Sequence, residues 1–565
     1  MPTFDDDKQN KKLEEIRKQE EEELVQTLAV EKYGIRSINL GPVSIENEAL
    51  RLVSEEQAKT LEVAPFRLLG KNIDIAVRNP GREEIKVLSQ DLVAKGYNPH
   101  FYMASLASLE KAWERYKELS FAAQNRVGGL EIQGDVILEL GQKIRTMKDI
   151  PEVIESVSKD NTSHKISRIL EIILAGGIST NASDIHIEPE EEKARLRLRL
   201  DGVLQDIMSF PQTTYKLMNS RIKLLSGLKL INNQAQDGRF SIFIGKDEIS
   251  IRTSLIPGAY GESIVMRILN PKSIQVKLED IGIEPKLFEI IGREIAKPNG
   301  LVLITGPTGS GKTTTLYAFL QKIYSTEIKI ITIEDPIEYH LPGITQTQTE
   351  SEKGYTFLEG LRSALRQDPD VIMVGEIRDS ETAKIAVESA LTGHLVFSTL
   401  HTNNAAGVIP RLIDLEVNPK ILTSALSLSI AQRLVRKLCN ECKNKREATA
   451  PEKTLIDLIL KTAKDEGKDL ATYGIDTTQP VELWTSAGCD KCNHTGFKGR
   501  IGIFEAILSD AGIEAIIPNN PSEREIKKVA STQGILDMRE DGVIKALKGV
   551  TSLEEVKSVV DLEEI

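Results

Sequence analysis

The sequence contains no apolar segment that could cross a membrane, because uninterrupted apolar runs such as Leu301–Ile304 fall well short of the ~18 residues that a spanning helix needs. It also has no excess of positive charge: 72 basic residues stand against 84 acidic ones, for a net charge of −12. An acidic chain binds nucleic acid and anionic lipid poorly, since both attract clustered basic side chains. Residues 1–7 lack the basic and apolar regions that open a secretory signal. These absences argue against a membrane-spanning, secreted or histone-like protein, and we expect a cytoplasmic one.

Aromatic residues are scarce, at 5% of the chain, so no basic, aromatic groove for stacking nucleic acid bases is indicated. Apolar residues make up 40% of the chain and charged residues 28%, which is typical of a folded globular protein. With 565 residues the chain is too long for one hydrophobic core. We therefore expect three or four domains.

Cysteine is also rare, and its four copies form two CxxC pairs, Cys439 with Cys442 and Cys489 with Cys492. In a chain without a secretory signal this pattern favours a tetrahedral zinc site over disulfides, although a redox CxxC and unpaired thiols remain alternatives. Four thiolates leave no open position for water, so we expect a structural role for the zinc. The long spacer Lys443–Gly488 must loop out with structure of its own.

A predicted strand, a glycine-rich turn and a predicted helix follow one another from Leu301 onward. The apolar run leads into the turn Gly306–Thr313, and apolar residues then recur at helical spacing from Leu316 to Ile323. This context is typical of a phosphate-binding loop, in which backbone N–H groups surround phosphate oxygens at a helix N-terminus. We expect Lys312 to reach the β- and γ-phosphates of ATP and Thr313 to ligate Mg²⁺. The predicted nucleotide-binding residues are Gly306, Pro307, Thr308, Gly309, Ser310, Gly311, Lys312, Thr313 and Thr314.

Three further predicted strands end in acidic or histidine clusters. Ile331–Ile333 runs into carboxylates that end at Glu338, where an attacking water could be polarised. Val371–Val374 runs into Glu376, which we expect to hold Mg²⁺ directly or through water. The third strand ends near His401, either a hydrogen-bonded core histidine or a sensor of the γ-phosphate. The nearby phosphate loop favours the sensor.

One predicted strand alternates arginine with leucine. Arg195, Arg197 and Arg199 lie on one face and the leucines on the other, and Asp201-Gly202 supplies a hairpin turn. The arginine face is either a solvent face paired with nearby glutamates or a surface for an anion or a neighbouring subunit.

These motifs together resemble the secretion-superfamily ATPases that drive type II secretion and type IV pilus assembly. The resemblance rests on GPTGSGKTT from Gly306, ITIEDPIE ending at Glu338, the stretch Leu365–Asp379 and the stretch Thr392–Asn403. SDIHIEP, RLRLDG and the CxxC pairs also match. The likeness is strong from about Ile166 to the C-terminus and weak before it.

The resemblance implies an α/β fold in which a RecA-like P-loop NTPase core follows a PAS-like α/β domain and a small N-terminal α/β domain. A zinc-knuckle and helical C-terminal region would close the chain, with Thr551 and Glu554 as a helical capping box. Lys8–Leu28 is read as a solvated leading helix or as a docking helix for a partner. The expected segments are a charged helix (1–29), an adaptor domain (30–120), a linker (121–160), the PAS-like domain (161–280), the ATPase core (281–435), the Cys₄ zinc subdomain (436–500) and a helical region (501–565).

The resemblance also implies roles for single residues. Lys312 and Thr313 bind phosphate and Mg²⁺, and Glu338 is the general base or water-positioning group. Glu376 organises Mg²⁺, and His401 is the histidine-box residue. The catalytic set is completed by two arginines brought from the preceding domain, Arg252 and Arg267, with Arg239 a weaker third candidate and a structural salt bridge the alternative for each.

The implied function is a hexameric, cytoplasmic ATPase, peripheral to the inner face of the membrane, that powers pilus assembly or type II secretion. Its cofactors would be ATP, Mg²⁺ and Zn²⁺, and its partners an inner-membrane platform protein and a cytoplasmic scaffold, with no direct nucleic acid and membrane association only through partners. The alternatives are a nucleotide-binding scaffold with little turnover and a DNA-translocating or competence-associated motor. The cyclic di-GMP motif of some relatives is not found, since Asn39-Leu40-Gly41 only faintly matches it.

Overall fold

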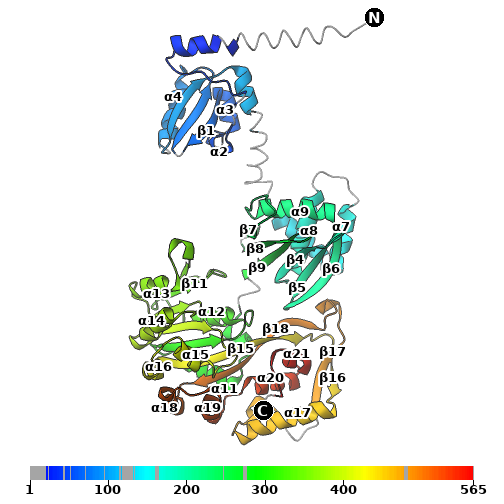
Figure 1. The fold of residues 1–565 in the computed structure, drawn as a ribbon. Helices are drawn as coiled ribbons and strands as arrows, with labels where there is room; N and C mark the ends of the chain where they lie inside the picture. Colours follow the sequence, from blue (N-terminus) through cyan, green and yellow to red (C-terminus); the bar gives the residue numbers. More distant parts are fainter. Residues whose placement is uncertain are drawn as a thin grey trace. The chain divides into compact units, whose positions relative to one another are not determined.

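A computed structural model describes residues 21–563 except 23, 42, 44, 51, 70, 95, 114–115, 117–131, 133, 159–164, 246, 272–275 and 476–480. The chain divides into two compact units, Met1–Ile132 and Gln133–Ile565 (Figure 1). Most of the expected charged leading helix lies outside the described residues, although residues 24–31 are helical. Among the helices of the described residues, none has the length and apolar character of a membrane span.

The first unit is a small α/β domain built on a three-stranded sheet of order β1-β2-β3. β1 pairs antiparallel with β2, and β2 pairs parallel with β3. Ile73–Val77 lie in β2 and are all buried. The elements are α2 (Asn47–Leu50), α3 (Glu55–Leu61), β1 (Val63–Leu69), β2 (Asn72–Val77), α4 (Glu83–Ala94) and β3 (Asn98–Met103).

The second unit begins with two helices, α6 and α7, inside the range 121–160 that we expected to be a linker. Both are amphipathic and bury apolar residues such as Ile137 and Ile154 against the rest of the unit. The described part of the expected linker is therefore mostly packed structure, because its apolar residues recur at helical spacing and find a partner surface.

A six-stranded antiparallel sheet of order β6-β5-β4-β9-β8-β7 follows, with helices α8 and α9 packed against it. An α/β domain at this position agrees with the expected one, while its PAS-like character stays a prediction. The elements are α6 (Gly134–Lys143), α7 (Asp149–Ser158), α8 (Lys165–Ser179), β4 (Asp184–Pro189), β5 (Lys193–Leu200), β6 (Val203–Pro211), α9 (Gln212–Leu225), β7 (Gln236–Ile244), β8 (Asp247–Gly258) and β9 (Gly261–Leu269).

Strand β5 is the arginine–leucine strand, and its leucines are buried. Its arginines pair with carboxylates: Arg197 with Asp206 at 3.0 Å and Arg199 with Asp184 at 3.4 Å. Arg195 lies 3.3 Å from Glu188. The arginine face is thus an ion-pair face, and most of its acids lie on the neighbouring strands β4 and β6.

A seven-stranded sheet of order β12-β11-β13-β14-β10-β15-β18 forms the core of the second unit. Only β18 runs antiparallel to its neighbour. Helices cover both faces of the sheet (Figure 1). Alternate residues of β10 enter two different hydrophobic clusters, Leu301 and Leu303 on one face and Val302 and Ile304 on the other. Burial on both faces explains why this strand is a continuous apolar run.

The predicted boundary between residues 500 and 501 falls inside β18, which completes this sheet. The core elements are η1 (Leu278–Asp280), α11 (Pro285–Ile295), β10 (Gly300–Thr305), α12 (Lys312–Ile323), β11 (Ile330–Glu334), β12 (Thr345–Gln348), η2 (Ser351–Lys353), α13 (Phe357–Leu365), β13 (Val371–Val374), α14 (Ser380–Leu391), β14 (Leu395–Leu400), α15 (Val408–Asp414), α16 (Pro419–Ala425), β15 (Leu426–Leu438) and β18 (Phe497–Leu508).

The segment between β15 and β18 loops out as a hairpin, β16–β17, that carries a helix, so the expectation of separate structure there is confirmed. Helices α17, α20 and α21 share one hydrophobic cluster with it. The elements are β16 (Lys443–Glu447), α17 (Ala450–Asp465), η3 (Leu470–Tyr473), β17 (Glu482–Ser486), η4 (Asp490–Cys492), α18 (Ala511–Ile516), η5 (Ile517–Asn519), α19 (Glu523–Ala530), η6 (Ser531–Gln533), α20 (Met538–Leu547) and α21 (Leu553–Val559).

The expected capping box of Thr551 and Glu554 is wrong by one residue. Ser552 caps α21, accepting a hydrogen bond from the Glu555 N–H at 3.3 Å. Thr551 is buried, and its hydroxyl donates to the Arg436 carbonyl of β15 at 2.8 Å. The Thr551 hydroxyl, which the sequence pattern assigned to the cap of the helix, instead bonds to strand β15.

Replacing Ser552 with alanine should destabilise the first turn of α21 by about 1 kcal/mol, because an amide of that turn loses its acceptor. Hydrogen exchange should then show the amide of Glu555 exchanging several-fold faster. Ser558→Ala is the matched control, since that exposed hydroxyl lies at the other end of the helix and donates to the Glu555 carbonyl. Equal protection of the Glu555 amide in the two variants would contradict the capping role of Ser552.

Candidate functional site

The glycine-rich turn lies between the end of β10 and the start of α12, as the sequence predicts. Gly306 and Gly311 have φ angles of 146° and 89°, which favour glycine. A Cβ at Gly306 would lie 2.5 Å from the Gln432 carbonyl oxygen, and one at Gly311 would lie 2.8 Å from the Gln432 side-chain nitrogen. Both positions therefore require glycine, and the turn can approach β15 closely.

Lys312 opens α12 and points back over the turn. Its Nζ donates to the carbonyl oxygens of Gly306 at 2.8 Å and Pro307 at 3.2 Å. Burial lowers the pKa of Lys312, although the Glu376 carboxylate opposes the shift. The Ser310 hydroxyl is buried and has no hydrogen-bond partner among the described residues. An ammonium held by carbonyls and an unpaired buried hydroxyl are what a phosphate group would satisfy.

Glu376 and His401 lie together, at the ends of two neighbouring parallel strands. Glu376 follows β13 and His401 follows β14, and the His401 Nε2 is 3.2 Å from a Glu376 carboxylate oxygen. Burial would raise the pKa of Glu376, but hydrogen bonds and charge from Arg378 and then His401 outweigh it and lower that pKa. Glu376 therefore stays ionised, as a metal-organising carboxylate must.

His394, by contrast, precedes β14 and lies at the opposite end of the same strand. Its Nδ1 is 3.0 Å from the Ser389 carbonyl oxygen. Because the glycine-rich turn follows β10, which is parallel to β14, His401 lies at the same edge of the sheet as the turn and His394 does not.

Glu338 lies in the loop after β11 and meets an arginine from the preceding domain. Arg252, on β8, approaches the Glu338 carboxylate at 3.2 Å and donates to the Ile337 carbonyl at 2.7 Å. Arg267 is the cross-strand partner of Arg252, but its own bond is to Asp184, at 2.8 Å. That bond, followed by charge from Asp184 and Glu338, raises the pKa of Arg267 against burial. Of the two predicted arginines, only Arg252 contacts a predicted catalytic residue directly.

Arg239, the weaker candidate, lies opposite Arg252 in the β7–β8 ladder. Thr313 is exposed in the first turn of α12, next to Lys312, and Thr314 is partly exposed. Pro307, Thr308 and Gly309 are exposed on the turn. These placements leave the side of the loop that would face a nucleotide open.

Sequence reasoning missed two arginines at this edge. Arg378 binds Glu376 through its guanidinium and lies within the motif that carried the resemblance, so its spacing was an available signal. Arg433, on β15, donates to the Asn403 carbonyl at 2.7 Å and would lie 3.1 Å from a Cβ at Gly306. No local pattern marks Arg433, because only the sheet order brings β15 beside β10.

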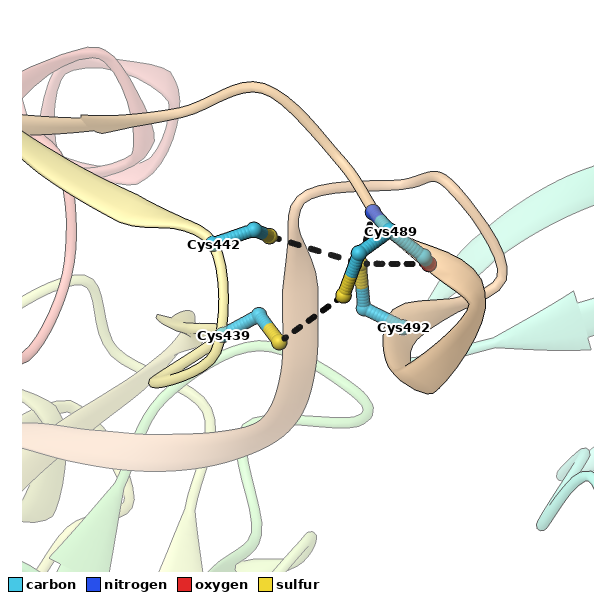
Figure 2. A group of neighbouring side chains, drawn as sticks. All are labelled: Cys439, Cys442, Cys489 and Cys492. Carbon is cyan, nitrogen blue, oxygen red and sulfur yellow. Dashed lines mark hydrogen bonds between the residues drawn. The ribbon is translucent and has the colours of Figure 1, made fainter.

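The four cysteines meet at one point, as predicted, although they come from two separate loops (Figure 2). Three pairs of sulfur atoms are each 3.8 Å apart: Cys439 with Cys489, Cys442 with Cys492, and Cys489 with Cys492. Four sulfurs placed tetrahedrally at ~2.3 Å from a zinc ion would be ~3.8 Å from one another. A disulfide would need ~2.05 Å. The cluster therefore fits a tetrahedral zinc ion and does not fit disulfides.

Backbone N–H groups also favour thiolate at this cluster. The Cys492 sulfur accepts hydrogen bonds from the N–H groups of Cys489 at 3.2 Å and Gly496 at 3.3 Å. Burial would raise the pKa of Cys492, but these N–H groups outweigh it and lower that pKa. A thiolate is the form that binds a metal ion.

The mostly parallel sheet with helices on both faces, the glycine-rich turn after β10 and the acids after β11 and β13 define an α/β protein. The family model described as "Type II/IV secretion system protein" matches residues 159–558. The chain belongs to the type II/IV secretion system protein family.

Two curated relatives support this family. The type IV pilus assembly ATPase PilB of Myxococcus xanthus is 35% identical over 570 residues, which cover 96% of each chain. The type II secretion system protein E of Pseudomonas aeruginosa is 42% identical over 411 residues, or 73% of this chain and 78% of that one. Among solved structures, the Legionella pneumophila ATPase DotB matches 71% of this chain and 97% of its own with a TM-score of 0.50 and 23% identity. That likeness concerns the fold alone.

Proposed function

We infer that this protein is an ATPase that powers type IV pilus assembly or type II secretion. The observation that carries this function is the placement of Lys312, Glu376 and Glu338 at one edge of a parallel sheet, after β10, β13 and β11. A phosphate-binding loop and two acids that can organise a metal ion and a water are what phosphoryl transfer to water requires. The two relatives named above carry the same two activities in their names.

In the proposed reaction, Lys312 and the N–H groups of the turn bind the β- and γ-phosphates of ATP. Thr313 and Glu376 offer the oxygen ligands that Mg²⁺ prefers, and the bound ion would neutralise charge on the phosphate oxygens. Glu338 orients a water and accepts its proton as the water attacks the γ-phosphorus and the bond to ADP breaks.

His401 and Arg252 complete the proposed site. His401 senses the γ-phosphate through its contact with Glu376. Arg252 now binds Glu338, and Arg267 lies within reach of the charge of Glu338. Both arginines supply positive charge from the preceding domain when the γ-phosphate is present. Such arginines typically raise the rate of phosphoryl transfer by roughly 10³-fold or more.

The cysteine cluster holds a structural zinc ion in this proposal. Its four sulfurs have the separation that a tetrahedral ion needs, and they link the end of β15 to the start of β18. The zinc would thus close the base of the β16–β17 hairpin.

We further propose that the protein works as a homo-hexamer at the inner face of the cytoplasmic membrane. It would act on pilins or pseudopilins through an inner-membrane platform protein and a cytoplasmic scaffold, without binding nucleic acid. The relatives' pilus and secretion machines support partners of this kind. In this proposal the core is RecA-like, the preceding domain is PAS-like, and the two rock against each other.

Phosphate release separates this motor from a nucleotide-binding scaffold. Glu376→Ala should lower turnover about 100-fold, because an organised metal ion contributes several kcal/mol to such reactions. A coupled phosphate assay on both proteins checks this. Glu381→Ala is the control, since that carboxylate is exposed in the first turn of α14 and has Arg362 as its ion-pair partner, at 4.0 Å. Equal rates for the wild type and Glu376→Ala would contradict the ATPase, and ATP binding without release would favour the scaffold.

A further inference from the structure

The loop between β11 and β12 carries Glu338, and residues on the C-terminal side of Glu338 are buried. The Glu338 side chain is 35% exposed and meets Arg252, which belongs to another domain. Its neighbours Tyr339 and Leu341 are 8% and 3% exposed. A base on such a loop acts only if the loop has one conformation.

One side-chain amide, that of Gln346 on β12, binds the end of β11 and two residues in the middle of this loop. Its Nε2 donates to a Glu334 carboxylate oxygen and to the Tyr339 carbonyl, each at 3.1 Å. Its Oε1 accepts a hydrogen bond from the Leu341 N–H at 2.6 Å. Gln346 therefore ties Glu334, the residue that ends β11, to Tyr339 and Leu341, which lie one and three residues after Glu338.

Tyr317 makes a second connection, from the helix that begins at Lys312. Its side chain is fully buried, and its hydroxyl donates to the Glu334 carboxylate. Its ring packs edge-on against the Tyr339 ring, with centroids 4.7 Å apart and planes at 77°. The residue beside Glu338 thus rests on the helix that binds phosphate.

Glu334 is the common acceptor of these bonds and is itself unable to reach a nucleotide. It is 3% exposed and also accepts a hydrogen bond from Thr332 at 2.5 Å. Burial raises the pKa of Glu334 in spite of these donors. Glu334 is therefore a buried anchor for the loop.

We propose that Gln346 and Tyr317 are positioning residues that hold Glu338 in line with the phosphate loop, a role that rests on the proposed function of Glu338 as the base. The amide holds Tyr339 and Leu341 relative to the end of β11, and the phenol holds the loop relative to α12. A general base must lie within hydrogen-bond reach of its water, and a displacement of ~1 Å can lower a rate by ~10²-fold.

The experiment measures kcat, KM for ATP and ADP affinity of the full-length protein and its variants. Gln346→Ala should lower kcat by roughly 10- to 100-fold with KM and ADP affinity within about twofold of the wild type, since the phosphate loop is untouched. Tyr317→Phe keeps the ring contact and loses only the hydroxyl bond, so a smaller loss of kcat is expected. Gln321→Ala, an exposed glutamine on α12, is the matched control and should keep the wild-type kcat.

The second measurement repeats Gln346→Ala in a Glu338→Gln background. If Gln346 acts through Glu338, removing its amide should change kcat less than about twofold there, because interacting residues are not additive. The same 10-fold loss in both backgrounds, or a loss that appears only in ADP affinity or in the thermal unfolding midpoint, would assign Gln346 to the core and overturn the proposal.

The activities of the variants distinguish a failure of the base role of Glu338 from a failure of the positioning role of Gln346 and Tyr317. If Glu338→Gln turns over ATP at the wild-type rate, Glu338 is not the base, and the positioning role of Gln346 and Tyr317 is overturned as well. Lost turnover by Glu338→Gln, together with full activity of Gln346→Ala and Tyr317→Phe, would leave the proposed function standing and overturn only the positioning role.

Discussion

Glu338→Gln should lower the rate of ATP hydrolysis by roughly 10²- to 10⁴-fold while ADP binding stays near that of the wild type, because a positioned general base contributes about that much. Glutamine keeps the size of the side chain and can still contact Arg252, but it cannot accept a proton. Lys312 bonds the carbonyls of Gly306 and Pro307, whereas the Glu338 carboxylate pairs with Arg252, so the proposed nucleotide-binding turn and Glu338 have different partners. The loss should therefore appear in kcat and not in affinity.

Single-turnover phosphate release and equilibrium ADP binding, measured on the same preparations, check this. Glu352→Gln is the matched control, since this exposed glutamate follows β12 at the surface. Weakened ADP binding without a loss of kcat would assign Glu338 to binding. An unchanged kcat in Glu338→Gln would show that another group acts as the base.

Cys492→Ser should release the metal ion and unfold the region that it closes. We expect the wild type to hold about one zinc per chain and the variant to hold none, since a tetrahedral site needs all four thiolates. Structural zinc contributes on the order of 10 kcal/mol to local folding. Cys492 also accepts two backbone hydrogen bonds, so its loss affects both the ion and the turn that precedes β18.

Metal analysis and limited proteolysis check the zinc prediction. Cleavage should appear within the β16–β17 hairpin of the variant, while the sheet around the phosphate loop stays resistant. Asn440→Ser, an exposed change between two of the cysteines, is the control that keeps every sulfur. Retained zinc in Cys492→Ser, or an uncleaved hairpin, would count against the site.

Local motifs were predictable because their chemistry depends on short spacing. The phosphate loop needs glycines and a lysine within one turn, and the structure places them between β10 and α12 as expected. The CxxC pairs were equally legible, since two knuckles with no cysteine left over imply one cluster, which the structure contains. Features that depend on contacts between distant segments were harder to predict. The two helices in the range 121–160 and the cap at Ser552 were missed, because both depend on tertiary contacts.

The sequence by itself determined which side chains can do the chemistry: Lys312, Glu376 and the cysteines are set by short motifs in which each residue type has one physical use. Only the tertiary structure decided what stands beside them. Strand order brings Arg433 next to Gly306, and the edge strand β12 brings Gln346 to the end of β11 and to Tyr339, the residue after Glu338. The reason is that hydrogen bonds between distant segments depend on how the sheet is ordered, and no spacing along the chain encodes that order.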